Sequence, residues 1–176
     1  MKTPIYFAVA FFSCLFVHAT TTGTLFEARA PPGAVEVLSI FNPTVVDHFY
    51  TTNASEIQQL TDFYGYESEG TSTGFIFLTE QPDTVPLFRL YSLGAADHMY
   101  TTSTQVRDHA VKRLGYFVEG ILGFVYTEDG PGRLPFFGLH NPNRIDHYYT
   151  TSADQRDDAA KNGWNVEGGV GYLLSP

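Results

Sequence analysis

The chain has 176 residues, of which 43% are hydrophobic and 16% are charged, and its formal net charge is −9. This composition is that of a globular domain and not of a disordered chain. Because an acidic surface repels phosphate backbones and anionic lipid, the charge argues against binding to nucleic acid or to a membrane surface. Sixteen glycines and ten prolines indicate many turns, which favours a β-rich chain.

The N-terminal residues have the pattern of a secretory signal peptide. Lys2 supplies a basic start, residues 5–17 are almost wholly apolar, and Val17 and Ala19 place small residues before a cleavage site. The apolar run is too short to span a membrane, which takes about 20 residues. We therefore expect residues 1–19 to be a signal peptide and the protein to be secreted and extracellular.

The rest of the chain divides into a lead-in and one domain. Residues 20–33 are rich in threonine and end in proline and glycine, which predicts a flexible lead-in or propeptide, and residues 34–176 are expected to form a single domain. The only cysteine, Cys14, lies in the signal peptide, so the mature protein is expected to be disulfide-free. This excludes thiol catalysis, and it requires that the core alone holds the domain together.

The domain contains the motif Asp-His-x-Tyr-Thr-Thr three times, at residues 47–52, 97–102 and 146–151. In each copy an apolar strand and a turn precede the motif, and a helix signal, an aromatic-x-x-Glu-Gly sequence and a Gly-aromatic sequence follow it. Such self-similarity is the signature of a repeat architecture. The three repeats span about 35–80, 85–128 and 133–174.

Each repeat is expected to contain about four short strands, two of them after the helix, and one short helix. Asn53 with Glu56 three residues later has the pattern of a capping box that starts the first helix, and Ser152 with Gln155 has the same pattern in the third repeat. Glycines at the left-handed position that ends a helix follow in all three repeats, at Gly65, Gly115 and Gly163.

Three repeats of this kind must close on one another, because one repeat cannot bury its own apolar face. A propeller of four-stranded blades usually needs at least four blades. We therefore expect a mainly β, β-trefoil-like fold with three pseudo-symmetric repeats, and an open three-unit β/α array is the alternative.

The ordered set of motifs resembles the signature of a repeat family of unknown function, found in secreted fungal and bacterial proteins and often appended to secreted hydrolases. The resemblance covers nearly all of the mature chain, residues 35–174. It implies a trefoil-like, lectin-like module, and it supplies no catalytic residues.

The motif itself offers the groups that sugar recognition needs, because a carboxylate, an imidazole and an aromatic ring can bind hydroxyls and the C–H face of a sugar. The single tryptophan adds a possible stacking platform. The candidate ligand-binding residues are Asp47, His48, Tyr50, Asp97, His98, Tyr100, Asp146, His147, Tyr149 and Trp164.

A structural role is the alternative for the motif, since aspartate after a turn commonly binds backbone N–H groups and a scaffold demands the same recurrence. A function carried by one repeat would instead lie where the copies differ. The differing positions are Phe41, Tyr91 and His140; Ser39, Arg89 and Gly138; and Tyr66, Tyr116 and Trp164.

Catalytic and metal chemistry is disfavoured. The motif histidines could meet near a three-fold axis, but the sequence contains no short-range zinc spacing, no nucleophile elbow and no phosphate-binding loop. We therefore predict no catalytic residue, no metal site and no cofactor. Asn53 begins a valid N-glycosylation sequon, Asn-Ala-Ser.

The sequence therefore favours a secreted, non-catalytic carbohydrate-binding module with a glycan or polysaccharide as its partner. The alternative is a protein-binding module, such as a protease inhibitor or a secreted effector that binds a secreted protein. A polysaccharide hydrolase ranks third.

Overall fold

The computed structural model describes residues 30–70 and 72–175. The predicted signal peptide, Cys14 and most of the predicted lead-in lie outside these residues. Within the described part of the chain no helix is both long and apolar enough to cross a membrane.

The protein is mainly β, as the sequence predicts, and its elements fall into three consecutive segments. Segment 1 comprises β1 (Ala34–Glu36), β2 (Leu38–Asn42), β3 (Asp47–Thr51), α1 (Ala54–Tyr64), β4 (Glu67–Ser68) and β5 (Phe75–Phe77). Segment 2 comprises β6 (Thr84–Ser92), β7 (Asp97–Thr101), α2 (Thr104–His109), the π-helical turn η1 (Ala110–Leu114) and β8 (Phe117–Tyr126). Segment 3 comprises β9 (Arg133–Asn141), β10 (Asp146–Thr150), α3 (Ala153–Lys161) and β11 (Asn165–Leu174).

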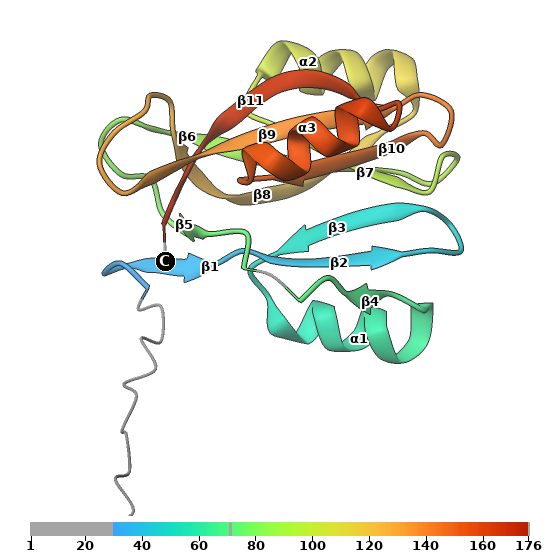
Figure 1. Cartoon of the computed structure of the whole chain (residues 1–176), viewed down its shortest axis with the longest axis horizontal. Helices are drawn as coiled ribbons and strands as arrows, with labels where there is room; N and C mark the ends of the chain where they lie inside the picture. The colour runs from blue at the N-terminus through green and yellow to red at the C-terminus, as the bar shows by residue number, and fades with distance from the viewer. Residues whose placement is uncertain (1–29, 71, 176) are drawn as a thin grey trace, which may run out of the picture.

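The strands of each segment pair in the same antiparallel order. The strand that carries the motif pairs with the strand before it, and the strand after the helix pairs on the other side, which gives β3–β2–β4, β7–β6–β8 and β10–β9–β11. Strands β5, β8 and β11 also pair with one another and so link the three segments. Figure 1 shows α1 beneath the β2–β3 pair, α2 at the opposite edge of the molecule, and α3 in front of β9 and β10.

The prediction of four short strands per repeat is wrong for segments 2 and 3. The two strands expected after each helix are one ten-residue strand, β8 or β11, with shifts of register along its length. Gly120 and Gly168, with φ angles of 151° and 114°, lie at these shifts. A glycine of the Glu-Gly sequence therefore bends a continuous strand instead of ending it.

The helices begin where the sequence predicts, with Asn53, Ser103 and Ser152 as N-caps. Gly65 and Gly115 take the left-handed conformation at the C-terminal ends of α1 and η1, whereas the C-cap of α3 is Asn162, and Gly163, with a φ angle of 88°, follows it. Side-chain oxygens of these N-caps accept hydrogen bonds from backbone N–H groups of the first turn, which stabilises each helix start.

The capping boxes differ from those that the sequence predicts, because a motif threonine lies between the N-cap residue and the residue three positions later. The N–H of Asn53 donates to Thr51 Oγ1 at 3.0 Å, and the Thr51 hydroxyl donates to Glu56, so the threonine stands between the two residues of the box. Thr150 does the same between Ser152 and Gln155. This relay gives the first threonine of the motif a structural role.

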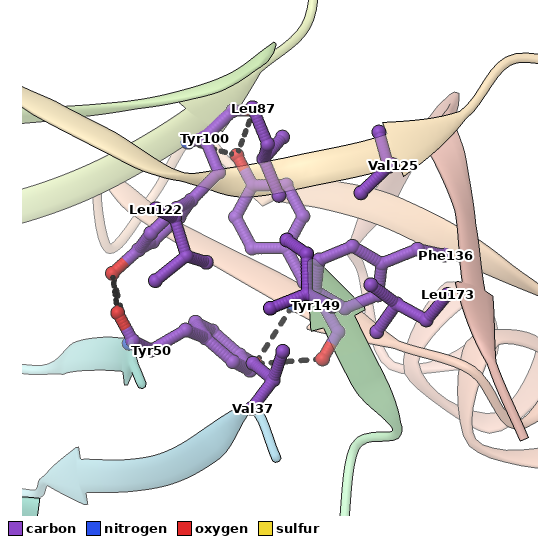
Figure 2. Close-up of a cluster of buried hydrophobic side chains, with 10 residues drawn as sticks. Val37, Tyr50, Leu87, Tyr100, Leu122, Val125, Phe136, Tyr149 and Leu173 are labelled. Carbon is purple, nitrogen blue, oxygen red and sulfur yellow. Dashed lines mark hydrogen bonds between the residues drawn. The ribbon is translucent and has the colours of Figure 1, made fainter. Parts of the chain in front are cut away.

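The main core lies where the three segments meet, and each segment contributes side chains to it (Figure 2). The tyrosine of each motif copy is at its centre. The buried members are Val37, Tyr50, Ile76, Leu87, Tyr100, Leu122, Val125, Phe136, Tyr149 and Leu173.

Candidate functional site

The motif tyrosines form a closed ring of hydrogen bonds. The hydroxyl of Tyr50 donates to the backbone oxygen of Tyr149 and accepts from its backbone N–H, and Tyr149 bonds Tyr100 in the same way, as Tyr100 bonds Tyr50. All six distances lie between 2.7 and 2.9 Å. Burial raises the pKa of all three phenols, so each stays protonated and able to donate.

The motif aspartates and histidines form a second ring. Asp47 accepts from the backbone N–H of His98 at 2.8 Å, and its other oxygen lies 2.7 Å from His98 Nδ1. Asp97 binds His147 in the same way, and Asp146 binds His48. Each aspartate therefore ties down the motif of a neighbouring segment.

The far nitrogen of each histidine faces the glutamate of the aromatic-x-x-Glu-Gly sequence. The distances from Nε2 to the nearest carboxylate oxygen are 3.7 Å for His48 and Glu69, 3.5 Å for His98 and Glu119, and 3.9 Å for His147 and Glu167. For His98, burial acts to lower the pKa, but hydrogen bonds that its ring donates to Asp47 and Glu119 outweigh burial and place the pKa above its ordinary value.

These contacts correct the predicted ligand-binding role of the tyrosines and aspartates. Tyr50, Tyr100 and Tyr149 are at most 3% exposed, and Asp47, Asp97 and Asp146 at most 1%, so they offer almost no surface to a sugar. Their polar atoms are already paired within the protein. The motif therefore joins the segments, and the three histidines are largely buried within the same network.

Trp164 is half-buried in segment 3, and it differs from the tyrosines at the corresponding positions of segments 1 and 2. The corresponding Tyr66 and Tyr116 donate their hydroxyls to Asp47 and Asp97, whereas the indole of Trp164 makes no such contact with Asp146. Its ring lies 5.8 Å from Tyr148 and 5.9 Å from His48, centroid to centroid. It supports an aromatic cluster at the junction of segments 1 and 3.

Three corresponding pockets lie at the junctions between segments. One side of each pocket is formed by the two motif threonines of one segment and by the start of the helix that follows them. The other side is formed by a neighbouring segment, through the glutamate of its Glu-Gly sequence and the residue that pairs with its motif tyrosine across the strands. We name them by their segments: the 1–3 pocket of about 260 Å³, the 1–2 pocket of about 160 Å³ and the 2–3 pocket of about 220 Å³.

The 1–2 pocket is lined and narrowed by the side chain of Arg89. Its guanidinium makes two hydrogen bonds to Glu56, at 3.0 and 3.1 Å, and its Nε lies 2.9 Å from Glu119. The guanidinium also lies 5.0 Å from the centre of the Phe49 ring. The Arg89 hydrogen bond is the main reason that the pKa of Glu56 lies below its ordinary value.

The 1–3 pocket contains the same kinds of groups without the arginine. Ser39 stands where segment 2 has Arg89, Glu69 stands in place of Glu119, Tyr148 in place of Phe49, and Gln155 in place of Glu56. The Oε1 of Gln155 accepts hydrogen bonds from Thr150 and from Tyr148, which leaves its amide nitrogen as a donor. The pocket therefore combines a carboxylate, an amide, hydroxyls and an aromatic ring.

The 2–3 pocket is less polar. Gly138 stands at the arginine position, Met99 at the aromatic position and Val106 at the position of Glu56 and Gln155. The sequence comparison of the three copies marked Ser39, Arg89 and Gly138 as differing, but it missed Glu69, Tyr148 and Gln155 as site residues. A sequence signal for Tyr148 existed, because the variable third position of the motif is Phe in the first copy, Met in the second and Tyr in the third.

Two clusters in the described residues hold groups that could bind a metal ion. Asp47, Asp97 and Asp146 form one, and His140, His147 and Glu167 form the other. The sequence disfavours a zinc site formed by the three motif histidines. In the described residues these histidines do not form a metal-binding cluster with one another. Asn53 of the glycosylation sequon is exposed, and its side-chain oxygen caps α1 through Ser55 N–H at 2.9 Å.

The fold and the site define a mainly β protein whose three segments are joined by buried hydrogen bonds and meet at polar pockets. Residues 36–174 match the family described as domain of unknown function (DUF5648), and the chain belongs to this family. No curated protein and no solved structure matches the chain.

Proposed function

We propose that the protein is a secreted, non-catalytic carbohydrate-binding module and that the 1–3 pocket is its binding site. The observation that carries the proposal is Arg89, because it narrows the corresponding 1–2 pocket, binds the carboxylates there and so indicates which groups such a pocket can bind. Ser39 is too short to reach into the 1–3 pocket in the same way, which leaves more of that space to a ligand.

The groups of the 1–3 pocket suit one sugar residue. Glu69 can accept hydrogen bonds from hydroxyls, Gln155 can donate to them, and the Tyr148 ring can pack against the C–H face of a sugar. A volume of about 260 Å³ is small for a drug-sized ligand and matches a single sugar ring with its water.

The charge of the pocket favours a neutral polyol over a cation. Arg89 is neutralised by two carboxylates, Glu56 and Glu119, whereas the 1–3 pocket offers Glu69 and the neutral Gln155. A bound cation would therefore find only part of the compensation that Arg89 receives. The same comparison predicts one binding site per chain and not three equivalent ones.

We also propose that the chain is built from three repeats closed about a pseudo-three-fold axis, in a β-trefoil-like arrangement. The cyclic tyrosine and aspartate–histidine contacts support this closure, while the three strands of segment 2 and of segment 3, in place of four, depart from the strand count that we expected for a trefoil. Secretion is supported by the signal-peptide pattern of residues 1–19.

The test is a glycan array followed by calorimetric titration of the best ligand with two variants at one position. Ser39→Arg should abolish binding, because it supplies the side chain that narrows the 1–2 pocket and binds its carboxylates, and Ser39→Ala should bind within a few-fold of the wild type. Absence of glycan binding, or unchanged binding by Ser39→Arg, would contradict the proposal. Tight inhibition of a protease without any glycan binding would support the protein-binding alternative.

A further inference from the structure

A cluster of two histidines and one glutamate exists only in segment 3. His140 on β9 and His147 on β10 are directly paired across the two strands, and their rings stack with centroids 4.5 Å apart. Glu167 on β11 places one carboxylate oxygen 3.9 Å from His140 Nδ1 and the other 3.9 Å from His147 Nε2. One ligand atom from each residue lies within 4.8 Å of the others.

The Nε2 atom of His147 is held in place for a ligand. Its Nδ1 lies 2.7 Å from a carboxylate oxygen of Asp97, which is fully buried and also accepts the hydroxyl of Tyr116. A carboxylate on the far nitrogen of a histidine fixes the ring and its tautomer, as it does behind histidine ligands of metal ions. Nε2 is then the atom with a free lone pair, and it faces Glu167.

The other two segments lack this donor set. Phe41 and Tyr91 occupy the position of His140, so each has one imidazole beside one glutamate. In segment 2 the glutamate is also paired with Arg89 at 2.9 Å. The second histidine therefore adds a third possible donor to a contact that joins segments, and the three donor atoms lie within 4.8 Å of one another.

The cluster opens into the largest of the described pockets, of about 600 Å³, between segments 2 and 3. Its walls are mainly apolar, with Met99, Val106, Leu114 and Ile145 among them. The polar residues of its lining include His140, His147 and Glu167. A ligand held by these three side chains would therefore keep one side open to the pocket.

We propose that His140, His147 and Glu167 bind one divalent transition-metal ion, with zinc the best match. Two imidazoles and a carboxylate are a donor set that zinc accepts, and three protein ligands leave a fourth position for water or a small molecule from the apolar pocket. The carboxylate oxygens stand farther from the imidazoles than hydrogen-bond distance, which leaves space for the ion after a small movement of the exposed Glu167 side chain. This site is separate from the 1–3 pocket and does not depend on glycan binding.

The experiment is a calorimetric titration of the metal-free full chain with Zn²⁺ alone, and a parallel titration with Co²⁺ followed by its visible absorption. The wild type should bind one ion per chain, and the Co²⁺ spectrum should have the intensity of a four-coordinate site. His140→Phe, which installs the residue of segment 1, should abolish binding, and Glu167→Gln should weaken it.

The matched control is Glu69→Gln, which alters the corresponding glutamate of segment 1 and should leave Zn²⁺ binding unchanged. Circular dichroism should show that all variants are folded, and Glu167→Gln at an exposed position is the variant least able to disturb folding. Failure of the wild type to bind Zn²⁺, or equal binding by wild type and His140→Phe, would overturn the assignment. Loss of glycan binding by Glu69→Gln with zinc binding intact would separate this site from the proposed sugar site.

Discussion

At the scale of single residues, the tyrosine ring places each hydroxyl between two backbone groups of another segment. Tyr100→Phe would leave the N–H and the C=O of Tyr50 without partners in a fully buried place. An unsatisfied buried polar group costs about 1–3 kcal/mol, so we expect a loss of about 2–4 kcal/mol in the free energy of unfolding, measured by urea denaturation. Tyr64→Phe, at an exposed tyrosine, is the control. A loss below about 0.5 kcal/mol for Tyr100→Phe would show that the ring is not a stabilising element.

His98 links the second ring to pH. Its pKa in the folded protein is raised, because hydrogen bonds that its ring donates to Asp47 and Glu119 outweigh the opposing effect of burial. Its stabilising contribution is therefore fully present below the unfolded histidine pKa of about 6.5, and it is lost as the pH rises through the higher folded value. We expect the wild type to lose part of its stability advantage over His98→Gln across this window, in urea titrations at stepped pH. A constant difference between the two proteins would contradict the prediction, and exposed His109→Gln is the control.

At the scale of elements, the turn before each motif strand has an unusual backbone. Val46, Ala96 and Ile145 each precede the motif aspartate, and their φ angles are 61°, 54° and 54°. The left-handed region costs a residue other than glycine about 1–2 kcal/mol, and β-branched side chains are disfavoured there most strongly. The turn nevertheless recurs, because it directs the following aspartate to the neighbouring segment.

This strain can be relieved without changing the turn. Val46→Asn should raise the free energy of unfolding by about 1 kcal/mol, since asparagine tolerates the left-handed conformation. Val45→Asn, at the exposed neighbouring position, should give no such gain. The measurement is the midpoint of urea unfolding for both variants. A destabilised Val46→Asn would mean that packing of the valine side chain outweighs its backbone strain.

At the scale of the whole molecule, the sequence predicts the helices and strands better than the contacts that join the three segments. The β class, the helix caps and the left-handed glycines at Gly65 and Gly115 follow from local rules, and the structure confirms them. The role of Asp47 could not be read from the sequence, because its partner His98 lies 51 residues away in another segment. The strand count failed for a similar reason, since Gly120 bends β8 and does not break it, and only pairing with β6 decides this.

The candidate pocket also depends on contacts between segments. Ser39 and Tyr148 are far apart in the chain, and their meeting at one pocket follows only from the closure of segment 3 on segment 1. Comparison of the three copies marked Ser39 and Arg89 as differing positions, and these two residues line corresponding pockets. The comparison of the copies could not show that the recurring motif tyrosine, Tyr149 in segment 3, lies in the core while the variable residue before it, Tyr148, lines the pocket.

Closure also determines how the molecule should unfold. In a linear repeat array each unit contacts only its neighbours, so separate parts can unfold on their own. Here Tyr50 bonds Tyr149 and Tyr100 at once, so segment 1 is tied to both other segments, and strands β5, β8 and β11 join the three in one sheet region. Loss of one segment therefore removes hydrogen bonds from the other two.

We accordingly expect one cooperative transition in scanning calorimetry, with equal calorimetric and van't Hoff enthalpies. Tyr149→Phe, in segment 3, should lower the midpoint of that single transition and should not produce a second one. Hydrogen exchange of the backbone amides should show the same loss of protection in β3, β7 and β10. Two resolved transitions, or loss of protection confined to segment 3, would mean that the segments are independent and that the tyrosine ring does not couple them.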